Sequence, residues 1–194
     1  MKLVLILEID ELDKKTLRLL SQNPEISQTE ISESLRISQP AVNIRIHKLK
    51  EKGILAHLVG VNVKKAELFL AKIDISTNNT EHVLKFLDNC PLYLNSFLTS
   101  GRYNLTILLI SENIRSLMSC TDRHLRQNAV MKDLIKDMEF SIIITPIKDF
   151  IVPIKPILEK KKTAPCGAEC NNCSLYTDRC LGCPATLNYK GTLL

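Results

Sequence analysis

The chain has 194 residues, of which 45% are hydrophobic and 24% charged, and its formal net charge is +5. These proportions are those of one large or two small globular domains, and they exclude a disordered chain. The longest apolar run near the start, residues 3–7, is too short to cross a membrane, and acidic residues follow it at once. We therefore expect a cytoplasmic protein without a membrane partner.

The first part of the chain predicts three short helices. Asp10 begins the first helix, and Asn23 ends it, because the residue before a proline avoids helical backbone angles. Ser27 and Glu30 have the spacing of a capping box, which begins the second helix. Ser38 is the expected cap of the third helix.

The third helix and the segment after it complete a recognisable pattern. Val42, Ile46 and Leu49 recur at i, i+4 and i+7, so we expect them to form the buried stripe. Residues 54–63 alternate between apolar and polar and predict a short strand. Helix, turn, helix and strand in this order are typical of a winged helix-turn-helix, which we assign to residues 1–62.

The outward face of the third helix is the predicted DNA-contact surface. Residues 36–52 hold five basic residues and one acidic residue, and such a local basic stripe is a signal of nucleic-acid binding. We expect the basic side chains here to contact phosphates, Asn43 to contact an adenine edge and Ile44 to contact a thymine methyl. These base contacts predict that the partner is A/T-rich double-stranded DNA. The predicted contacts are Ser38, Gln39, Pro40, Asn43, Ile44, Arg45, His47 and Lys48. The alternatives are that Ile44 belongs to the core and that the basic residues form only a solvated helix face.

Residues 63–147 predict the βαββαβ order of a ferredoxin-like sandwich, so the fold class is α+β. Strands are expected at 68–75, 94–99, 105–110 and 138–147, and helices at 81–89 and 113–128. We expect helices on one sheet face, and an uncovered opposite face rich in Ile, Leu and Phe. An uncovered apolar face predicts a homodimer or a larger homo-oligomer. A dimer presents two third helices, so the operator is expected to be pseudo-palindromic.

Residues 148–194 predict a linker and a metal-binding, cysteine-rich tail. Five of the seven cysteines follow the spacing C-x3-C-x2-C-x6-C-x2-C: Cys166, Cys170, Cys173, Cys180 and Cys183. The odd total argues against a disulfide scaffold. One interpretation is a [4Fe-4S] iron–sulfur cluster on Cys166, Cys170, Cys173 and either Cys180 or Cys183, favoured because it uses Cys166. The other is zinc held by the pairs Cys170/Cys173 and Cys180/Cys183, with Cys166 spare.

The two metal interpretations have different consequences. A cluster would make the tail a sensor that couples redox state or iron and sulfur supply to DNA binding, whereas zinc would make it a small structural unit that folds with its metal. Simple redox thiols are a third possibility. Cys90 and Cys120 are expected in the core, and the four histidines are expected to be structural or on the surface.

The sequence favours a protein that is not an enzyme. Neither a nucleophile–base pair, a phosphate loop nor a carboxylate dyad stands out. The C-x3-C-x2-C spacing also occurs in radical enzymes, but those need a large barrel around the motif, and here the motif lies near the end of the sequence. A sandwich-domain regulatory protein that does not bind DNA is a further alternative.

Four short motifs carry a resemblance to a known family. They are residues 9–13 (IDELD), 38–42 (SQPAV), 48–54 (KLKEKGI) and 100–105 (SGRYNL). With them, residues 8–148 resemble the Lrp/AsnC transcriptional regulators of bacteria and archaea; the cysteine tail, which points to an archaeal type, lies outside the common family core.

The resemblance implies a DNA-binding head and a dimerising sandwich that often builds octamers. It also implies a small-molecule effector, in many members an amino acid, bound near Ser100, Gly101, Arg102, Tyr103 and Asn104. Asn104 departs from the family, which usually has aspartate there, and Asn43 and Ile44 stand where the family often has Ser-Arg.

Overall fold

The computed structural model describes residues 9–153, 155, 157 and 159–192. Its contacts divide the chain into two compact units, Met1–Leu58 and Val59–Leu194. The predicted linker and tail therefore belong to the same unit as the sandwich. Within the described residues, no helix is long and apolar enough to cross a membrane.

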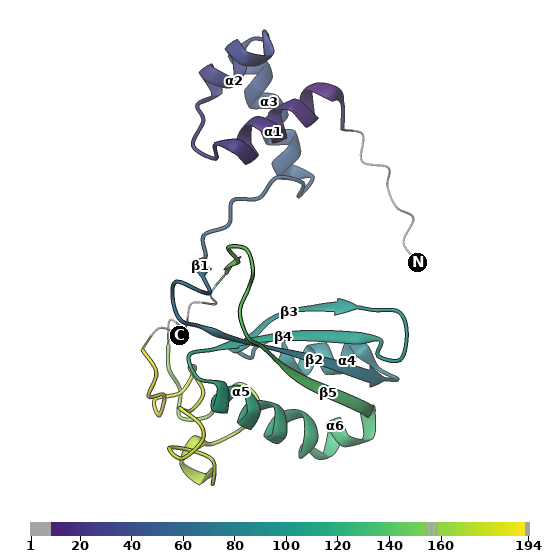
Figure 1. Cartoon of the computed structure of the whole chain (residues 1–194), viewed down its shortest axis with the longest axis vertical. Helices are drawn as coiled ribbons and strands as arrows, with labels where there is room; N and C mark the ends of the chain where they lie inside the picture. The colour runs from purple at the N-terminus through teal and green to yellow at the C-terminus, as the bar shows by residue number, and fades with distance from the viewer. Residues whose placement is uncertain (1–8, 154, 156, 158, 193–194) are drawn as a thin grey trace. The chain divides into compact units, whose positions relative to one another are not determined.

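Unit 1 is the expected set of three helices (Figure 1). These are α1 (Glu11–Gln22), α2 (Gln28–Leu35) and α3 (Gln39–Glu51). Asp10 caps α1 in a reciprocal capping box with Asp13, and Ser27 caps α2 in the same way with Glu30. Ser38 caps α3 by accepting a hydrogen bond from the backbone of Ala41. All three predicted helix starts are therefore confirmed.

The core of unit 1 is the apolar stripe predicted for α3. Val42, Ile46 and Leu49 are buried, and Val42 and Ile46 pack with Ile31 of α2.

The strand predicted for residues 54–63 is wrong for most of its length, because only β1 (Val61–Asn62) is a strand.

Strand β1 is short because a strand extends only as far as a neighbour supplies hydrogen bonds. Its neighbour is β6 (Ile151–Val152), which pairs antiparallel with both of its residues. The segment predicted as a plain linker therefore contains a strand.

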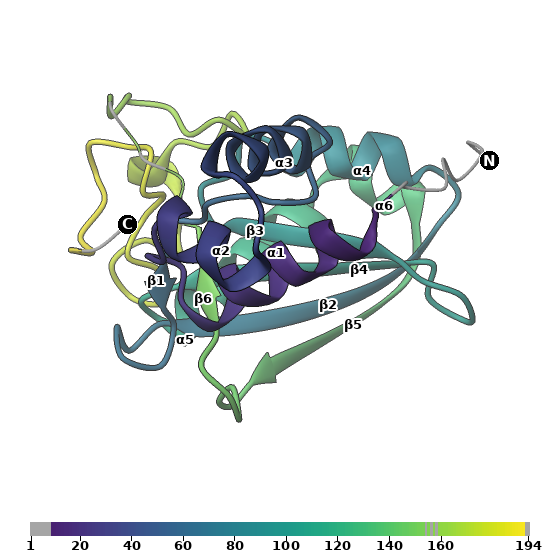
Figure 2. The same cartoon turned by 90° about the horizontal axis from the view of Figure 1, so that it is seen from above.

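The second unit is built on a four-stranded antiparallel sheet, with the order β3-β4-β2-β5 (Figure 2). Its strands are β2 (Phe69–Thr77), β3 (Tyr93–Leu98), β4 (Leu105–Ser111) and β5 (Ile135–Ile143). Helices α4 (Thr80–Leu87), α5 (Ile114–Thr121) and α6 (Ala129–Leu134) cover one face, as Figure 1 shows. The predicted βαββαβ order is confirmed.

The helix predicted for residues 113–128 is divided. Helix α5 continues into a π-helical turn, η1 (Asp122–Arg126), and Asn128 then caps the separate helix α6. Strand β5 consequently begins at Ile135 rather than at the predicted residue 138.

The prediction of an uncovered face rich in Ile, Leu and Phe is correct only for part of that face. Successive side chains of a strand point to opposite faces. Because Ile73 of β2 packs in the helix-covered core, its neighbours Lys72 and Asp74 lie on the other face, where they form an ion pair of 2.7 Å. Strand β5 is paired so that Phe140 lies opposite Ile73, which turns this aromatic ring toward the helices as well. Leu108 and the exposed Phe97 share this face, because Leu108 pairs with Lys72 and Phe97 pairs with Thr106. The uncovered face is therefore mixed, and the apolar argument for a dimer rests on its β3–β4 side.

Candidate functional site

Helix α3 presents the surface that was predicted to contact DNA. Ile44 is 67% exposed although Val42 and Ile46 on either side are buried. The alternative that Ile44 belongs to the core is therefore wrong. Among the other predicted contacts, the exposed ones are Ser38, Gln39, Pro40, Asn43 and His47, whereas Arg45 and Lys48 are half-buried. Asn43 accepts a weak hydrogen bond of 3.4 Å from the Gln28 side chain.

The two half-buried cations of α3 bind carboxylates of the same unit. Arg45 Nη1 donates to Asp10 Oδ2 at 2.6 Å and to Asp13 Oδ1 at 2.7 Å. Lys48 Nζ lies 3.3 Å from the other Asp13 oxygen. The Asp13 side chain is fully buried, so this network joins the first turn of α1 to the middle of α3. The DNA contact of Arg45 remains a prediction, and its guanidinium already has two partners inside the unit.

The same network lowers the pKa of both carboxyl groups. Burial by itself raises the pKa of Asp13, but hydrogen bonds from Arg45, from the Asp10 backbone and from Lys48 outweigh it. For Asp10, the hydrogen bond from Arg45 is the main cause of its lowered pKa. Both groups are thus held in their charged form.

The predicted effector residues form the turn between β3 and β4. Gly101 has a backbone φ of +110°, which suits glycine and not a residue with a Cβ atom. Arg102 donates to Asp137 Oδ2 at 2.7 Å and lies over the Tyr103 ring. Ser100 is exposed at the tip.

Asn104 has a structural partner in the backbone of β2. Its Oδ1 accepts from the Thr77 N–H at 3.0 Å, and its Nδ2 donates to the Thr77 carbonyl at 2.8 Å. Both ends of the amide are used, so the start of β4 is joined to the end of β2. An effector that needs the Asn104 side chain would have to displace these two bonds.

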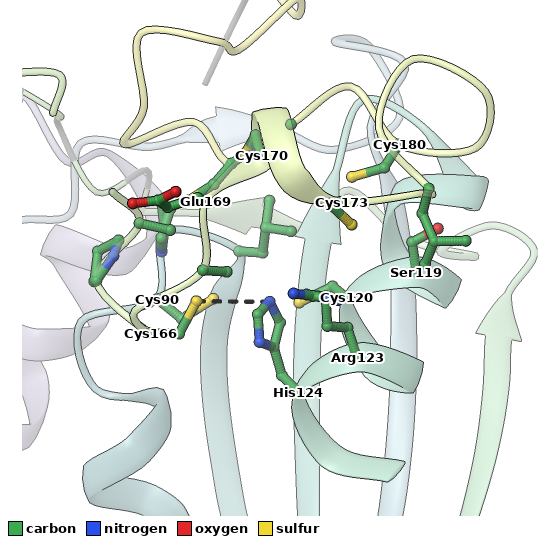
Figure 3. A pocket seen from close by; sticks show the side chains of 18 residues that line it. Cys90, Ser119, Cys120, Arg123, His124, Cys166, Glu169, Cys170, Cys173 and Cys180 are labelled. Carbon is green, nitrogen blue, oxygen red and sulfur yellow. Dashed lines mark hydrogen bonds between the residues drawn. The ribbon is translucent and has the colours of Figure 1, made fainter. Parts of the chain in front are cut away.

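The tail and the sandwich together enclose a cysteine-lined cavity. Its walls include all seven cysteines of the chain: Cys90, Cys120, Cys166, Cys170, Cys173, Cys180 and Cys183. About 620 Å³ of it is free of atoms, counting the part that opens to solvent. In Figure 3, Cys170 and Cys173 of the tail lie across the cavity from Arg123 and His124, whereas Cys166 lies beside the His124 ring. We refer to this region as the cysteine cavity.

Helix α5 holds the tail in place through two serine side chains. The Leu181 N–H donates to Ser116 Oγ at 3.0 Å, and Ser119 Oγ donates to the Arg179 carbonyl at 3.3 Å. Both serines are buried. They satisfy backbone groups of Arg179 and Leu181, which lie outside the one short 3-10 turn described in the tail, η2 (Cys170–Asn172).

The Cys170 sulfur contacts two groups of the segment around Cys183. The Cys183 N–H donates to Cys170 Sγ at 3.4 Å, and the Thr186 hydroxyl lies 3.6 Å from the same sulfur. Gly182 has a φ of +89°, and an added Cβ would lie 3.0 Å from the Asn188 carbonyl oxygen. Glycine is therefore required inside the Cys180–Cys183 pair, where the chain must turn back.

Cys166 is placed differently from the other tail cysteines. Its Sγ lies 3.7 Å from His124 Nε2, on η1. Burial raises the pKa of Cys166 and raises that of Cys183 to about 12, so these thiols stay protonated at neutral pH until something replaces the proton. Burial, and then the charge of Arg123, lower the pKa of His124, which keeps its ring neutral.

Cys90 and Cys120 are not only core residues, as predicted, but also walls of the cysteine cavity. The hydrogen bond from Cys120 lowers the pKa of Cys90 to about 7, and the same contact with burial raises the pKa of Cys120. The sequence carried one overlooked signal: Cys120 and His124 are four residues apart, a spacing that places two side chains on one helix face.

The cavity does not contain a preformed coordination sphere. In the part of the chain that the structure describes, no three Cys, His, Asp or Glu side chains converge with metal-binding geometry. The thiols are gathered on the walls of one cavity without converging on one point. Metal sites in small segments commonly take their final ligand geometry only when the metal binds.

Comparison with known proteins matches the three helices of unit 1 to a DNA-binding family. A family model described as winged helix-turn-helix DNA-binding matches residues 9–56. The transcriptional regulator Ptr1 of Methanocaldococcus jannaschii is 30% identical over 113 residues, which cover 56% of this chain and 76% of the relative. The regulatory protein AsnC of Haemophilus influenzae is 25% identical over 57% of this chain and 77% of its own length.

Solved structures show the same fold. Escherichia coli AsnC superposes with a TM-score of 0.62 at 20% identity, covering 72% of this chain and 95% of that one. A Neisseria meningitidis regulator in complex with L-Met superposes with a TM-score of 0.57 at 18% identity, covering 77% and 97%. Nearly all of each relative is thus matched, while about a quarter of this chain lies outside the alignment.

Proposed function

Because this chain belongs to the Lrp/AsnC family of DNA-binding transcriptional regulators, we propose that it controls transcription from an A/T-rich, pseudo-palindromic operator read by α3. The observation that carries this proposal is the exposure of Ile44 and Asn43 on a helix whose opposite side is buried. An exposed isoleucine suits a thymine methyl, and an amide suits an adenine edge. A homodimer or a larger assembly would supply the second α3.

Ile44→Ala is expected to reduce the preference for thymine at one operator position about tenfold, because the methyl contact is lost. The slope of log affinity against log salt should stay unchanged, since no phosphate contact is removed. Binding of operator variants with each base at that position, measured by fluorescence anisotropy at several salt concentrations, tests this.

Lys50→Ala is the matched comparison, because Lys50 is an exposed cation of the same helix. It should weaken binding equally for every operator variant and, if Lys50 meets a phosphate, reduce the salt slope by about one. A reduced salt slope for Ile44→Ala would contradict the assignment of this face. Absence of binding to any genomic fragment, with metal and without it, would favour a sandwich protein that does not act on DNA.

For the tail, we propose a metal centre on the cysteines around Cys170. The Cys183 N–H donates to Cys170 Sγ, and hydrogen bonds from backbone N–H groups are a usual way to stabilise a metal-bound thiolate. Cys166 instead contacts His124. This division favours zinc on Cys170, Cys173, Cys180 and Cys183. The [4Fe-4S] cluster requires Cys166 to leave His124 and join the other ligands.

Anaerobic purification with metal analysis tests the two centres against each other. We expect a colourless protein with zinc, and we expect Cys166→Ser to retain at least one zinc per chain. A brown protein with iron and acid-labile sulfide, which loses both on the Cys166→Ser change, would establish the cluster and with it the redox-sensing alternative. A protein with neither metal would contradict both.

The regulatory input is proposed to reach DNA binding through unit 2. Either the metal centre or a small-molecule effector near the β3–β4 turn can supply it. The Neisseria regulator in complex with L-Met supports an amino acid as the effector. Operator affinity measured with and without metal, and with and without a set of amino acids, separates these two inputs.

A further inference from the structure

We propose a second zinc-binding site, formed by Cys90, Cys120, His124 and Cys166, which joins the tail to the sandwich. The proposal rests in part on the tail centre described above, because it uses the donors that the four-cysteine centre leaves over. The donors of the cysteine cavity divide into a four-cysteine set within the tail and a set of three cysteines and one histidine shared between tail and sandwich. Both are ligand sets of tetrahedral structural zinc sites.

The first support is the geometry of Cys166 and His124. Their sulfur and nitrogen atoms are 3.7 Å apart. In a tetrahedral site with Zn–S near 2.3 Å and Zn–N near 2.0 Å, the two donor atoms are about 3.5 Å apart. The pair therefore already has nearly the separation that a shared zinc ion would impose, although it comes from segments 42 residues apart in sequence.

The second support is the placement of the other two thiols. Cys90 and Cys120 both line the cysteine cavity, and Cys120 lies four residues, about one helical turn, before His124. In Figure 3, Cys90 and Cys166 lie together on one side of the His124 ring. The three thiols and the His124 ring therefore line one cavity, and a zinc ion bound there would replace the protons of the thiols.

The third support is the environment. Cys120 is buried, and Cys90, His124 and Cys166 are half-buried, so an ion bound here would have protein rather than water around it. A site of three thiolates and a neutral imidazole carries a net negative charge, and the Arg123 side chain lines the same cavity. Soft thiolate and imidazole donors in a tetrahedral set favour zinc over magnesium or calcium.

The test uses the full chain, stripped of metal under anaerobic reducing conditions and titrated with Zn²⁺. We expect two zinc ions per chain in the wild type and one in each of Cys90→Ser, Cys120→Ser, Cys166→Ser and His124→Ala. His82→Ala removes an exposed histidine of α4 outside the cavity and should retain two. His124→Cys supplies another zinc ligand at the same position and should also retain two, which separates loss of a ligand from loss of folding.

Cys173→Ser distinguishes the two sites. It should leave one zinc, and Co²⁺ substituted for that ion should give the absorption of a three-thiolate rather than a four-thiolate centre. If the second site exists but the proposed tail centre does not, the wild type should bind one zinc ion. That ion should be lost in His124→Ala and kept in Cys173→Ser. A wild type with one zinc that survives His124→Ala, or a His124→Ala variant that still binds two, would overturn the second site.

Hydrogen exchange gives a readout that does not depend on counting ions. The backbone around Cys166 is a tight turn in which the Gly167 N–H donates to the Ala164 carbonyl at 2.9 Å. Zinc should slow exchange of this amide in the wild type and in His82→Ala, because the ion ties the turn to η1. Equal slowing in His124→Ala would contradict the proposal.

Discussion

Arg45→Met is expected to destabilise unit 1 by about 3 kcal/mol, the cost of leaving a buried carboxylate without its main partner. The Asp13 side chain is fully buried, and after the change it would keep Lys48, at 3.3 Å, and the Asp10 N–H, also at 3.3 Å, as partners. All of the phenylalanines and tyrosines lie in unit 2, and the chain has no tryptophan. Helical circular dichroism during urea unfolding should therefore show an earlier transition, while tyrosine fluorescence, which reports only unit 2, keeps its midpoint.

Two comparison variants isolate the buried pair. Lys50→Met changes an exposed cation on the same helix and should alter stability by less than about 0.5 kcal/mol. The double change Asp13→Leu with Arg45→Met should recover most of the loss, because an apolar pair can replace a buried ion pair. If Arg45→Met were as stable as Lys50→Met, the network would not hold α3 on α1.

Acidification provides an independent measurement of the same network. The pKa of Asp10 and of Asp13 is lowered in the folded chain. The contribution of these two carboxylates to the stability of unit 1 is fully present above the pKa of the unfolded chain, about 3.9. It is lost as the pH falls through their lower pKa values in the folded chain. Unit 1 of the wild type should therefore lose stability below about pH 4, and Arg45→Met should lose less, since most of that contribution is already absent.

Asn104→Asp is expected to destabilise the sandwich by about 2 kcal/mol, although aspartate is the usual family residue at this position. The change removes the N–H that donates to the Thr77 carbonyl at 2.8 Å and places a carboxylate oxygen against that carbonyl. Thr77 is buried, so water does not readily replace the lost donor. Tyrosine fluorescence should show an earlier unfolding transition of unit 2.

Asn95→Asp is the matched comparison for this change. The Asn95 side chain accepts a hydrogen bond from the Ser96 N–H at 2.8 Å, and a carboxylate can accept the same bond. The stability of unit 2 in the Asn95→Asp variant should therefore be nearly unchanged. The defect of Asn104→Asp should shrink as the pH falls, because a protonated carboxyl can again donate to Thr77. A defect that is constant with pH would mean that the lost hydrogen bond is not its cause.

Local sequence signals determined the helices of unit 1 and the order of elements in unit 2. The Ser27–Glu30 capping box and the i, i+4, i+7 stripe of α3 are short-range patterns, and short-range hydrogen bonds and packing satisfy them. The outward position of Ile44 followed from the same periodicity. The strand expected at residues 54–63 failed because its length depends on β6, which lies far along the chain at Ile151–Val152.

The sequence by itself also determined that the tail is rich in metal ligands, through the spacing of five cysteines in a short segment. Only the tertiary structure decided that Cys90, Cys120 and His124 line the same cavity, and that Arg45 binds Asp13 rather than projecting freely. The physical reason is distance along the chain. Side chains separated by tens of residues leave no periodic signal in one sequence, because their meeting depends on how sheet, helix and tail pack together.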